Sequence, residues 1–119
     1  MSEYQMGNVE SRFADIIWQN EPISSTLLAK QAESILGWKK STTYTVLKRL
    51  CDKGIFKNEN GTVSSLISKQ DFYALQSEKF VEETFSGSLP AFVAAFGTRK
   101  KLSDEEVKQL QSLIESMRR

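Results

Sequence analysis

The segment from residue 38 to residue 56 holds the side chains whose types and spacing could do chemistry. Hydroxyl groups and cations recur there at positions that one side of an α-helix shares, whereas the opposite side is apolar. Such groups bind phosphate oxygens and the base edges of the DNA major groove. The segment therefore predicts a recognition helix that lies on double-stranded DNA. An ordinary amphipathic helix with a basic surface is the alternative.

The hydroxyls and cations of this helix are predicted DNA contacts, whereas Asp52 on the same side is not. The apolar side that faces the protein consists of Thr43, Val46, Leu47 and Leu50. The side chains expected to approach bases are Ser41, Thr42, Tyr44 and Thr45. Those expected to contact phosphates are Lys39, Lys40, Lys48 and Arg49. Gly54 should end the helix in a left-handed conformation.

The chemistry of an enzyme or a metal centre is missing from this chain. It contains no histidine, which removes Ser–His and Cys–His nucleophilic pairs and most zinc sites. Its single cysteine, Cys51, lies beside the apolar side of the recognition helix and is expected to be a small buried side chain. No glycine-rich phosphate-binding loop is present. We therefore expect no enzymatic activity, no cofactor and no metal.

The composition is that of a small globular protein that needs no membrane. The chain has 119 residues, 39% of them hydrophobic and 26% charged. No apolar run approaches the roughly 20 residues that span a bilayer. The first residues lack the basic and apolar parts of a signal peptide, and one cysteine cannot form an internal disulfide. The cytoplasm is the expected location.

The distribution of charge favours nucleic acid although the net charge is only +1. Residues 36–58 hold six cations against the single carboxylate of Asp52. Residues 70–119 hold seven cations and eight anions. A positive surface within a nearly neutral protein is typical of a domain that binds DNA.

The elements around this helix predict a helix-turn-helix. A first helix should run from about Val9 to Asn20, before Pro22, with the apolar stripe Val9, Phe13, Ile16 and Ile17. Ser24 or Ser25 should cap a second helix that ends at Gly37. Its predicted apolar face is Leu27, Leu28, Gln31, Ala32 and Ile35. The short turn that follows leads into the recognition helix.

A β-hairpin is expected directly after the recognition helix. Asn60-Gly61 separates two β-prone runs, 55–58 and 62–67. A hairpin in this place is the wing of a winged helix-turn-helix, which we assign to residues 1–69. The expected fold class is mainly α with a small β-hairpin.

Residues 70–119 should form helices that pair two copies of the chain. Helices are predicted over 71–85, over 89–96, and after the capping box of Ser103 and Glu106. About fifty residues cannot bury an apolar segment such as 89–96 unaided. We therefore predict a helical dimerisation domain and a homodimer. Its interface residues should be Phe85, Leu89, Phe92, Val93, Phe96, Leu110 and Ile114.

These motifs resemble the penicillinase and methicillin-resistance repressors (the BlaI/MecI/CopY family). The resembling residues include Glu10 and Ile16-Ile17-Trp18, and above all Trp38-x-x-Ser-Thr-x-Tyr-Thr-Val-Leu-x-Arg-Leu-x-x-Lys-Gly-Ile55. Ser86-Gly-Ser-Leu89 and Leu102-Ser-x-Glu-Glu-x-x-x-Leu110 continue the resemblance. It implies a transcriptional repressor, a homodimer of winged-helix domains bound to palindromic operators.

The resemblance also implies how such repressors are released. In the antibiotic-sensing members a sensor-linked protease cuts an Asn-Phe bond, and Ala95-Phe96 occupies that place here. Family members often have Arg after the turn glycine as a DNA contact, where this chain has Thr62. The copper-responsive branch binds metal through a C-terminal Cys-x-Cys motif, which this chain lacks. A winged-helix module that binds protein, a metal-responsive repressor and a small hydrolase remain the alternative functions.

Overall fold

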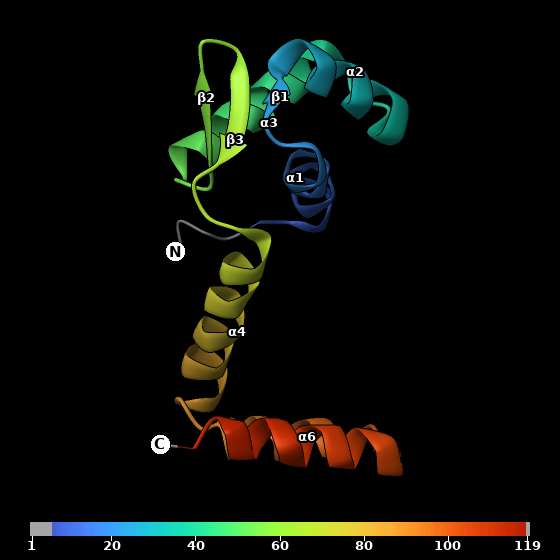
Figure 1. Ribbon diagram of the computed structural model, residues 1–119, viewed down its shortest axis with the longest axis vertical. Helices are drawn as coiled ribbons and strands as arrows, with labels where there is room; N and C mark the ends of the chain where they lie inside the picture. Colours follow the sequence, from blue (N-terminus) through green and yellow to red (C-terminus); the bar gives the residue numbers. More distant parts are fainter. Residues whose placement is uncertain (1–5, 119) are drawn as a thin grey trace. The chain divides into compact units, whose positions relative to one another are not determined.

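The computed structural model describes residues 6–118, in which the chain forms two compact units. Unit 1 extends to Ser77, and unit 2 begins at Glu78. The elements, in chain order, are α1 (Asn8–Asn20), β1 (Ile23–Ser24), α2 (Ser25–Leu36), α3 (Lys40–Asp52), β2 (Phe56–Glu59), β3 (Thr62–Ser65), α4 (Lys69–Phe85), α5 (Leu89–Gly97) and α6 (Asp104–Ser116) (Figure 1). The predicted fold class, mainly α with a small β-hairpin, is confirmed.

Local capping sets the ends of the helices that flank the turn. The hydroxyl of Ser24 accepts a hydrogen bond of 3.1 Å from the N–H of Leu27, so Ser24 is the residue that caps α2. After α3, Gly54 has a φ of +82°, which a residue without a side chain adopts at little cost. The N–H groups of Gly54 and Ile55 reach back to the carbonyls of Cys51 and Leu50. This pairing terminates α3 as the sequence predicts.

The sheet has one more strand than the sequence predicts. Its order is β1-β3-β2, with antiparallel pairing throughout. Asn60 and Gly61 have φ values of +53° and +87°, as a two-residue hairpin turn requires, and join β2 to β3. β1 pairs Ile23 with Val63 on the other side of β3. The predicted hairpin is therefore present as two strands of a three-stranded sheet, beside α3 (Figure 1).

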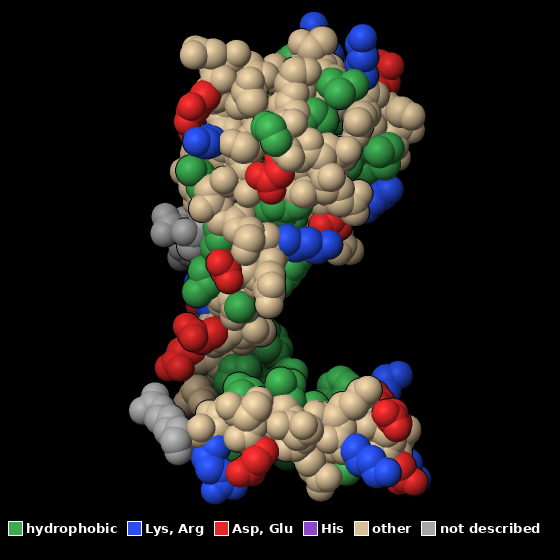
Figure 2. All heavy atoms as spheres, in the orientation of Figure 1, with side chains coloured by type: hydrophobic (Ala, Val, Ile, Leu, Met, Phe, Trp, Pro, Cys, Tyr) green, Lys and Arg blue, Asp and Glu red, His purple; other side chains and the backbone are tan. Residues whose placement is uncertain are grey.

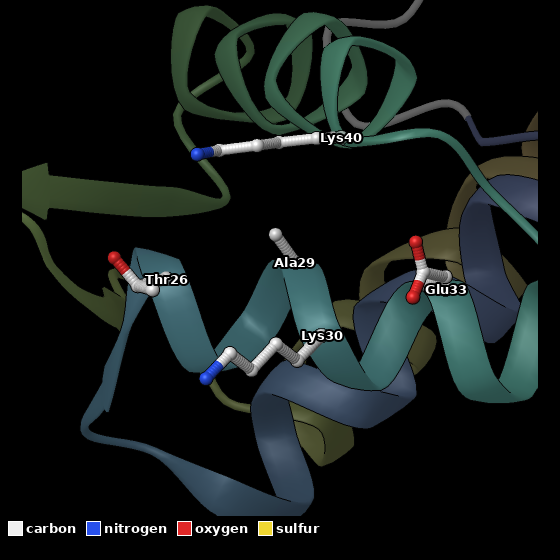
Figure 3. Close-up of a pocket in the computed structure, with 5 residues that line it drawn as sticks. All are labelled: Thr26, Ala29, Lys30, Glu33 and Lys40. Atoms are coloured by element: carbon white, nitrogen blue, oxygen red, sulfur yellow. The ribbon is translucent and has the colours of Figure 1, made fainter.

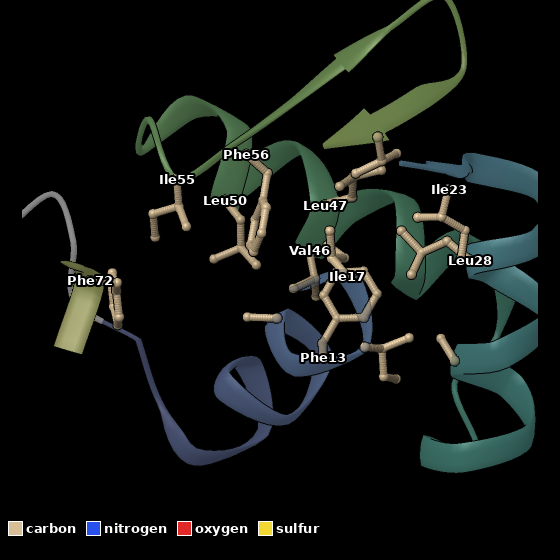
Figure 4. Close-up of a cluster of buried hydrophobic side chains, with 14 residues drawn as sticks. Phe13, Ile17, Ile23, Leu28, Val46, Leu47, Leu50, Ile55, Phe56 and Phe72 are labelled. Atoms are coloured by element: carbon tan, nitrogen blue, oxygen red, sulfur yellow. The ribbon is translucent and has the colours of Figure 1, made fainter. Parts of the chain in front are cut away.

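Apolar side chains from α1, α2, α3 and the sheet form one core in unit 1 (Figure 4). Phe13, Leu28, Leu50 and Phe56 are completely buried in it. Phe72, from the start of α4, joins the same cluster. This order of elements and this core are those expected of a winged helix-turn-helix, and they hold α3 by its apolar side.

Two of the predicted apolar faces are partly wrong. Val9 of α1 and Leu27 and Ile35 of α2 have exposed fractions of 51%, 47% and 55%. The buried positions include the small residues Ala14 and Ala29 instead. The reason is geometric, because a close approach between helices is made at small side chains and leaves larger neighbours at the rim.

Unit 2 contains the end of α4, then α5 and α6. The hydroxyls of Ser88 and Ser103 cap α5 and α6, and Ser103 and Glu106 form the predicted capping box. Phe80, Phe85 and Phe92 form a cluster with ring centroids 5.6–6.0 Å apart. Yet no residue between 78 and 118 is buried, and hydrophobic side chains are visible along α6 (Figure 2). Unit 2 thus lacks a core of its own.

The boundary between the units falls inside α4. This helix begins at Lys69 and gives its first residues to unit 1, where Lys69 forms an ion pair of 2.8 Å with Asp15 of α1. The functional division predicted between residues 69 and 70 stays a prediction. Among the described helices, none combines the length and the apolar character that crossing a membrane requires.

Candidate nucleic-acid interface

The exposed side of α3 brings together most of the polar residues that the sequence singled out. Thr43, Val46, Leu47 and Leu50 are buried on the inner side. The outer side exposes Ser41, Thr42, Thr45, Lys48 and Arg49 to solvent. A helix of 13 residues with this division presents hydroxyls and cations on a single surface. The geometry fits a helix that lies in the major groove.

The start of α3 carries cations and no side-chain cap. Lys39 occupies the capping position, where its ammonium cannot accept a hydrogen bond from the helix, and the first turn contains no acidic residue. The first N–H groups of any helix lack partners within the helix. Lys39 and Lys40 form no ion pair with any residue that the structure describes. N–H groups without a side-chain cap, beside two cations, make this end of α3 suited to an anion such as a phosphate.

Two cations of α3 contact carboxylates of the protein itself. Lys48 lies 3.2 Å from Asp52, with side-chain exposures of 77% and 66%. An ion pair this exposed contributes little to stability. Lys48 can therefore readily bind another anion in place of Asp52. Arg49 donates instead across to α1, where its Nη1 lies 3.3 Å from Oε2 of Glu10. Glu10 is only 19% exposed, so this second pair lies much closer to the protein interior.

The environment of Glu10 favours its charged form. Burial disfavours the carboxylate, but the N–H of Gly7 and the charges of Lys53 and Arg49 outweigh burial, and the pKa of Glu10 is lowered from its ordinary value of 4.5. Gly7 donates to Oε1 at 3.1 Å. Glu10 is therefore ionised at neutral pH and holds both the start of α1 and the Arg49 side chain.

Tyr44 and Cys51 lie on the opposite flank of α3, and neither is fully exposed. The Tyr44 hydroxyl donates toward the hydroxyl of Ser25 at 3.4 Å, and the ring packs against the core. Burial, and then the nearby charge of Asp52, raise the pKa of the Cys51 thiol. A thiol in this setting stays protonated and unreactive, as expected for a packing residue.

A groove between α2 and the start of α3 adds residues that the sequence analysis missed. It measures about 140 Å³ and is lined by Thr26, Ala29, Lys30, Glu33 and Lys40. Lys40 extends from α3 above the α2 side chains, toward the end where Thr26 lies (Figure 3). The four residues on α2 recur at the i, i+3, i+4, i+7 spacing, which is the signal that could have found Lys30.

The wing offers fewer cations than the helix. Thr62 is exposed at the first position of β3, where it pairs with Ser24 and Glu59 of the neighbouring strands. Lys57 of β2 forms an ion pair of 2.9 Å with Glu59. The charge of the wing is therefore partly neutralised. Across the part of the chain that the structure covers, no group of three or more His, Cys, Asp or Glu could hold a metal ion.

Comparison with known proteins agrees with this geometry. The profile of the penicillinase repressor family matches residues 6–116. A penicillinase repressor of Bacillus licheniformis is 26% identical over 93% of this chain and 90% of its own length. The methicillin resistance regulatory protein MecI of Mammaliicoccus sciuri is 24% identical over 93% of this chain and 94% of its own. The resemblance and the absence of an enzymatic role predicted from the sequence are confirmed, and the chain belongs to the penicillinase repressor family of transcriptional regulators.

Proposed function

We propose that this protein is a homodimeric repressor that binds a palindromic operator through the outer side of α3. The observation that carries the proposal is the start of α3, where no side chain caps the helix and Lys39 and Lys40 lie at the end of an exposed row of hydroxyls. A cap at this position stabilises a helix by about 1 kcal/mol, and α2, α5 and α6 all have one. A phosphate would supply the missing partner in α3.

The roles along α3 follow from the position of each side chain. Ser41, Thr42 and Thr45 lie where they can approach base edges, since hydroxyls can donate to or accept from any base. Lys39 and Lys40 would bind one phosphate, and Lys48 would exchange Asp52 for another. Lys30, across the groove from Lys40, would extend this path along the backbone. Thr62 of the wing would add a polar contact without charge.

The exposed apolar surface of unit 2 supports the homodimer. Its large apolar side chains have exposed fractions of 36–65%: Phe80, Leu89, Val93, Phe96, Leu102, Val107, Leu110, Leu113, Ile114 and Met117. Phe85 and Phe92, the remaining predicted interface residues, are half-buried in the ring cluster. Soluble monomers rarely expose large contiguous apolar patches, and so many exposed apolar side chains in so short a segment favour a partner that covers them. A second copy that covers this face would give unit 2 the core it lacks.

Dimerisation would set both the affinity and the form of the operator. Two identical domains related by a twofold axis read an inverted repeat, with half-sites about one helical turn apart or a multiple of it. Joining two heads raises the affinity by roughly 10²–10⁴ through effective concentration. Release of the operator would then need only the loss of the dimer.

A cut near Ala95-Phe96 by a sensor-linked protease is the proposed route of release. Both residues are exposed near the end of α5. The carbonyl of Ala95 accepts hydrogen bonds from the N–H and the hydroxyl of Thr98, at 3.3 and 2.8 Å. A protease binds its substrate as an extended strand, so the last turn of α5 must unwind first. The cut would separate α6 from the rest of the chain.

Salt-dependent binding to duplex DNA tests the proposed function. A duplex taken from upstream of the gene should be shifted by the full chain, and the logarithm of its affinity should fall linearly with the logarithm of salt concentration. A winged-helix module that binds protein would show neither effect. Sedimentation should show a dimer at micromolar concentration. A stable monomer there would contradict the homodimer.

A further inference from the structure

We propose that Arg49 is a positioning residue, which fastens the recognition helix to α1 through Glu10 and contributes no phosphate contact of its own. This inference rests on the proposed function, since it assigns a role within the same DNA-binding surface. It differs from the role that the sequence assigned to Arg49, and the two roles predict opposite results.

Arg49 lies on a flank of α3 and not in the middle of its outer side. Ser41, Thr45 and Lys48 follow one another along the middle of the outer side. Arg49 lies one position further round the helix, on the flank that faces α1, and its guanidinium reaches Glu10 across that flank. Tyr44, on the other flank, reaches Ser25 at the start of α2. Each flank of α3 is thus joined to a neighbouring helix, and the middle of its outer side is left for a ligand.

The two ion pairs of α3 differ in their exposure and in the elements that they join. Lys48 and Asp52 are both well exposed and lie on one helix, so breaking their contact changes no packing. Glu10 is 19% exposed, accepts from Gly7 with its other oxygen, and lies on a different helix 39 residues away in the chain. Removing Arg49 would leave this partly buried carboxylate with only the N–H of Gly7 and the charge of Lys53.

We expect the contact between Arg49 and Glu10 to control the roll of α3, which is its rotation about its own axis relative to α1. The apolar side of α3 fixes its depth in the core, and the hydrophobic effect that drives this burial is itself non-directional. A charge-assisted hydrogen bond at the flank has a defined geometry. Base contacts depend on that roll, whereas contacts between lysines and phosphates tolerate small rotations because ammonium groups on long side chains adjust.

Glu10→Gln in the full chain distinguishes a positioning role of Arg49 from a phosphate contact, because the two roles predict opposite changes in DNA affinity. The probes are the best duplex selected by the full chain from a random pool and a random-sequence duplex of equal length. If Arg49 positions α3, Glu10→Gln weakens binding to the selected duplex relative to the random duplex and leaves the salt slope unchanged. If Arg49 is instead a phosphate contact restrained by Glu10, the variant frees it, so both affinity and salt slope rise. That second result would overturn the proposal.

Arg49→Ala and its neighbour Lys48→Ala form a matched pair, since both remove one cation from the exposed side of α3. Lys48→Ala should flatten the salt slope by about one unit on both duplexes. Arg49→Ala should leave the slope as it is and lower affinity only for the selected duplex. A loss of about one unit in Arg49→Ala as well would contradict the positioning role.

A charge exchange provides the rescue. Arg49→Glu alone should reduce the preference for the selected over the random duplex, and adding Glu10→Arg should recover part of that preference, because the two side chains can pair again in the opposite sense. Thermal unfolding of each variant shows whether unit 1 is folded. A double variant that is folded but prefers the selected duplex no more than Arg49→Glu does would overturn the proposal. A wild-type chain that binds neither duplex would instead remove the proposed function.

Discussion

The indole N–H of Trp18 donates a hydrogen bond of 3.1 Å to the main-chain carbonyl of Ile67. This bond joins the end of α1 to the segment that leads from the sheet into α4. The same indole ring packs against Phe56 and Phe72, with centroid distances of 5.2 and 5.7 Å. Trp18 therefore binds the sheet, α1 and the start of α4 into one unit.

Trp18→Phe should destabilise the protein while leaving the fold intact. The ring contacts would partly persist, but the carbonyl of Ile67 would lose its donor, which costs about 1–2 kcal/mol. Trp38→Phe is the control, since that ring contacts Phe13 at 5.0 Å and its indole makes no side-chain hydrogen bond to any residue that the structure describes. Denaturant unfolding followed by circular dichroism measures both. A smaller loss in Trp18→Phe than in the control would contradict this role.

The stability contributed by Glu10 should depend on pH in a defined direction. Its pKa is lowered in the folded chain, so its carboxylate stabilises the fold above the ordinary pKa of 4.5. The contribution is lost as the pH falls through the lower, folded value. Glu10→Gln should therefore unfold at a lower temperature than the wild type at neutral pH, and the difference should shrink below about pH 4.5. A difference that is constant with pH would contradict the account of this site.

Thr45 and Lys48 should have different effects on DNA recognition. Thr45→Ala removes a hydroxyl from the middle of the outer side and should change which sequences are preferred, by about 1–3 kcal/mol at one base pair. The Thr45 hydroxyl donates to the carbonyl of Ser41, so its lone pairs face outward to accept from a base. Lys48→Ala should weaken binding to all sequences equally. Competition between selected and single-substituted duplexes measures both; unchanged preference in Thr45→Ala would argue against base contact.

Removing α6 should abolish tight binding without unfolding unit 1. A chain of residues 1–95 keeps the whole core of unit 1 and loses α6. Its operator affinity should fall by roughly 10²–10⁴ relative to the full chain at equal salt. Residues 1–118 serve as the control for truncation itself. Equal affinity of the two truncated chains would rule out release by proteolysis and point to a small ligand or a protein as inducer.

Local patterns in the sequence predicted the elements that depend on local physics. The Asn60-Gly61 turn, the Ser103 cap and the end of α3 at Gly54 each follow from the conformational preferences of one or two residues. The strand β1 was not predicted because two residues are too few to show a periodicity. It forms by pairing with Val63, a residue distant in the sequence. The burial of Ala29 in place of Leu27 depends on how closely two helices approach, which periodicity alone does not specify.

The candidate site was predicted in its polar residues and missed in its internal partners. Ser41, Thr45 and Lys48 are exposed together, as the helical spacing implied. The contact between Glu10 and Arg49 joins residues on different helices, and no local pattern signals it. Lys30 was missed because it lies outside the basic segment 36–58. Its helical spacing from Thr26 is nevertheless visible in the sequence. Contacts between elements thus distinguish cations that can bind a ligand from cations that hold the fold.

Selection of binding sites from a pool of random duplexes by the full chain tests whether two copies of α3 recognise a specific sequence together. A dimer that binds DNA through two copies of α3 should enrich an inverted repeat whose half-sites are centred about 10 bp apart or a multiple of it. Thr45→Ala should select a repeat altered at the same position in both half-sites. Enrichment of a single half-site would contradict the dimer, and the absence of any enriched sequence would contradict specific DNA recognition by α3.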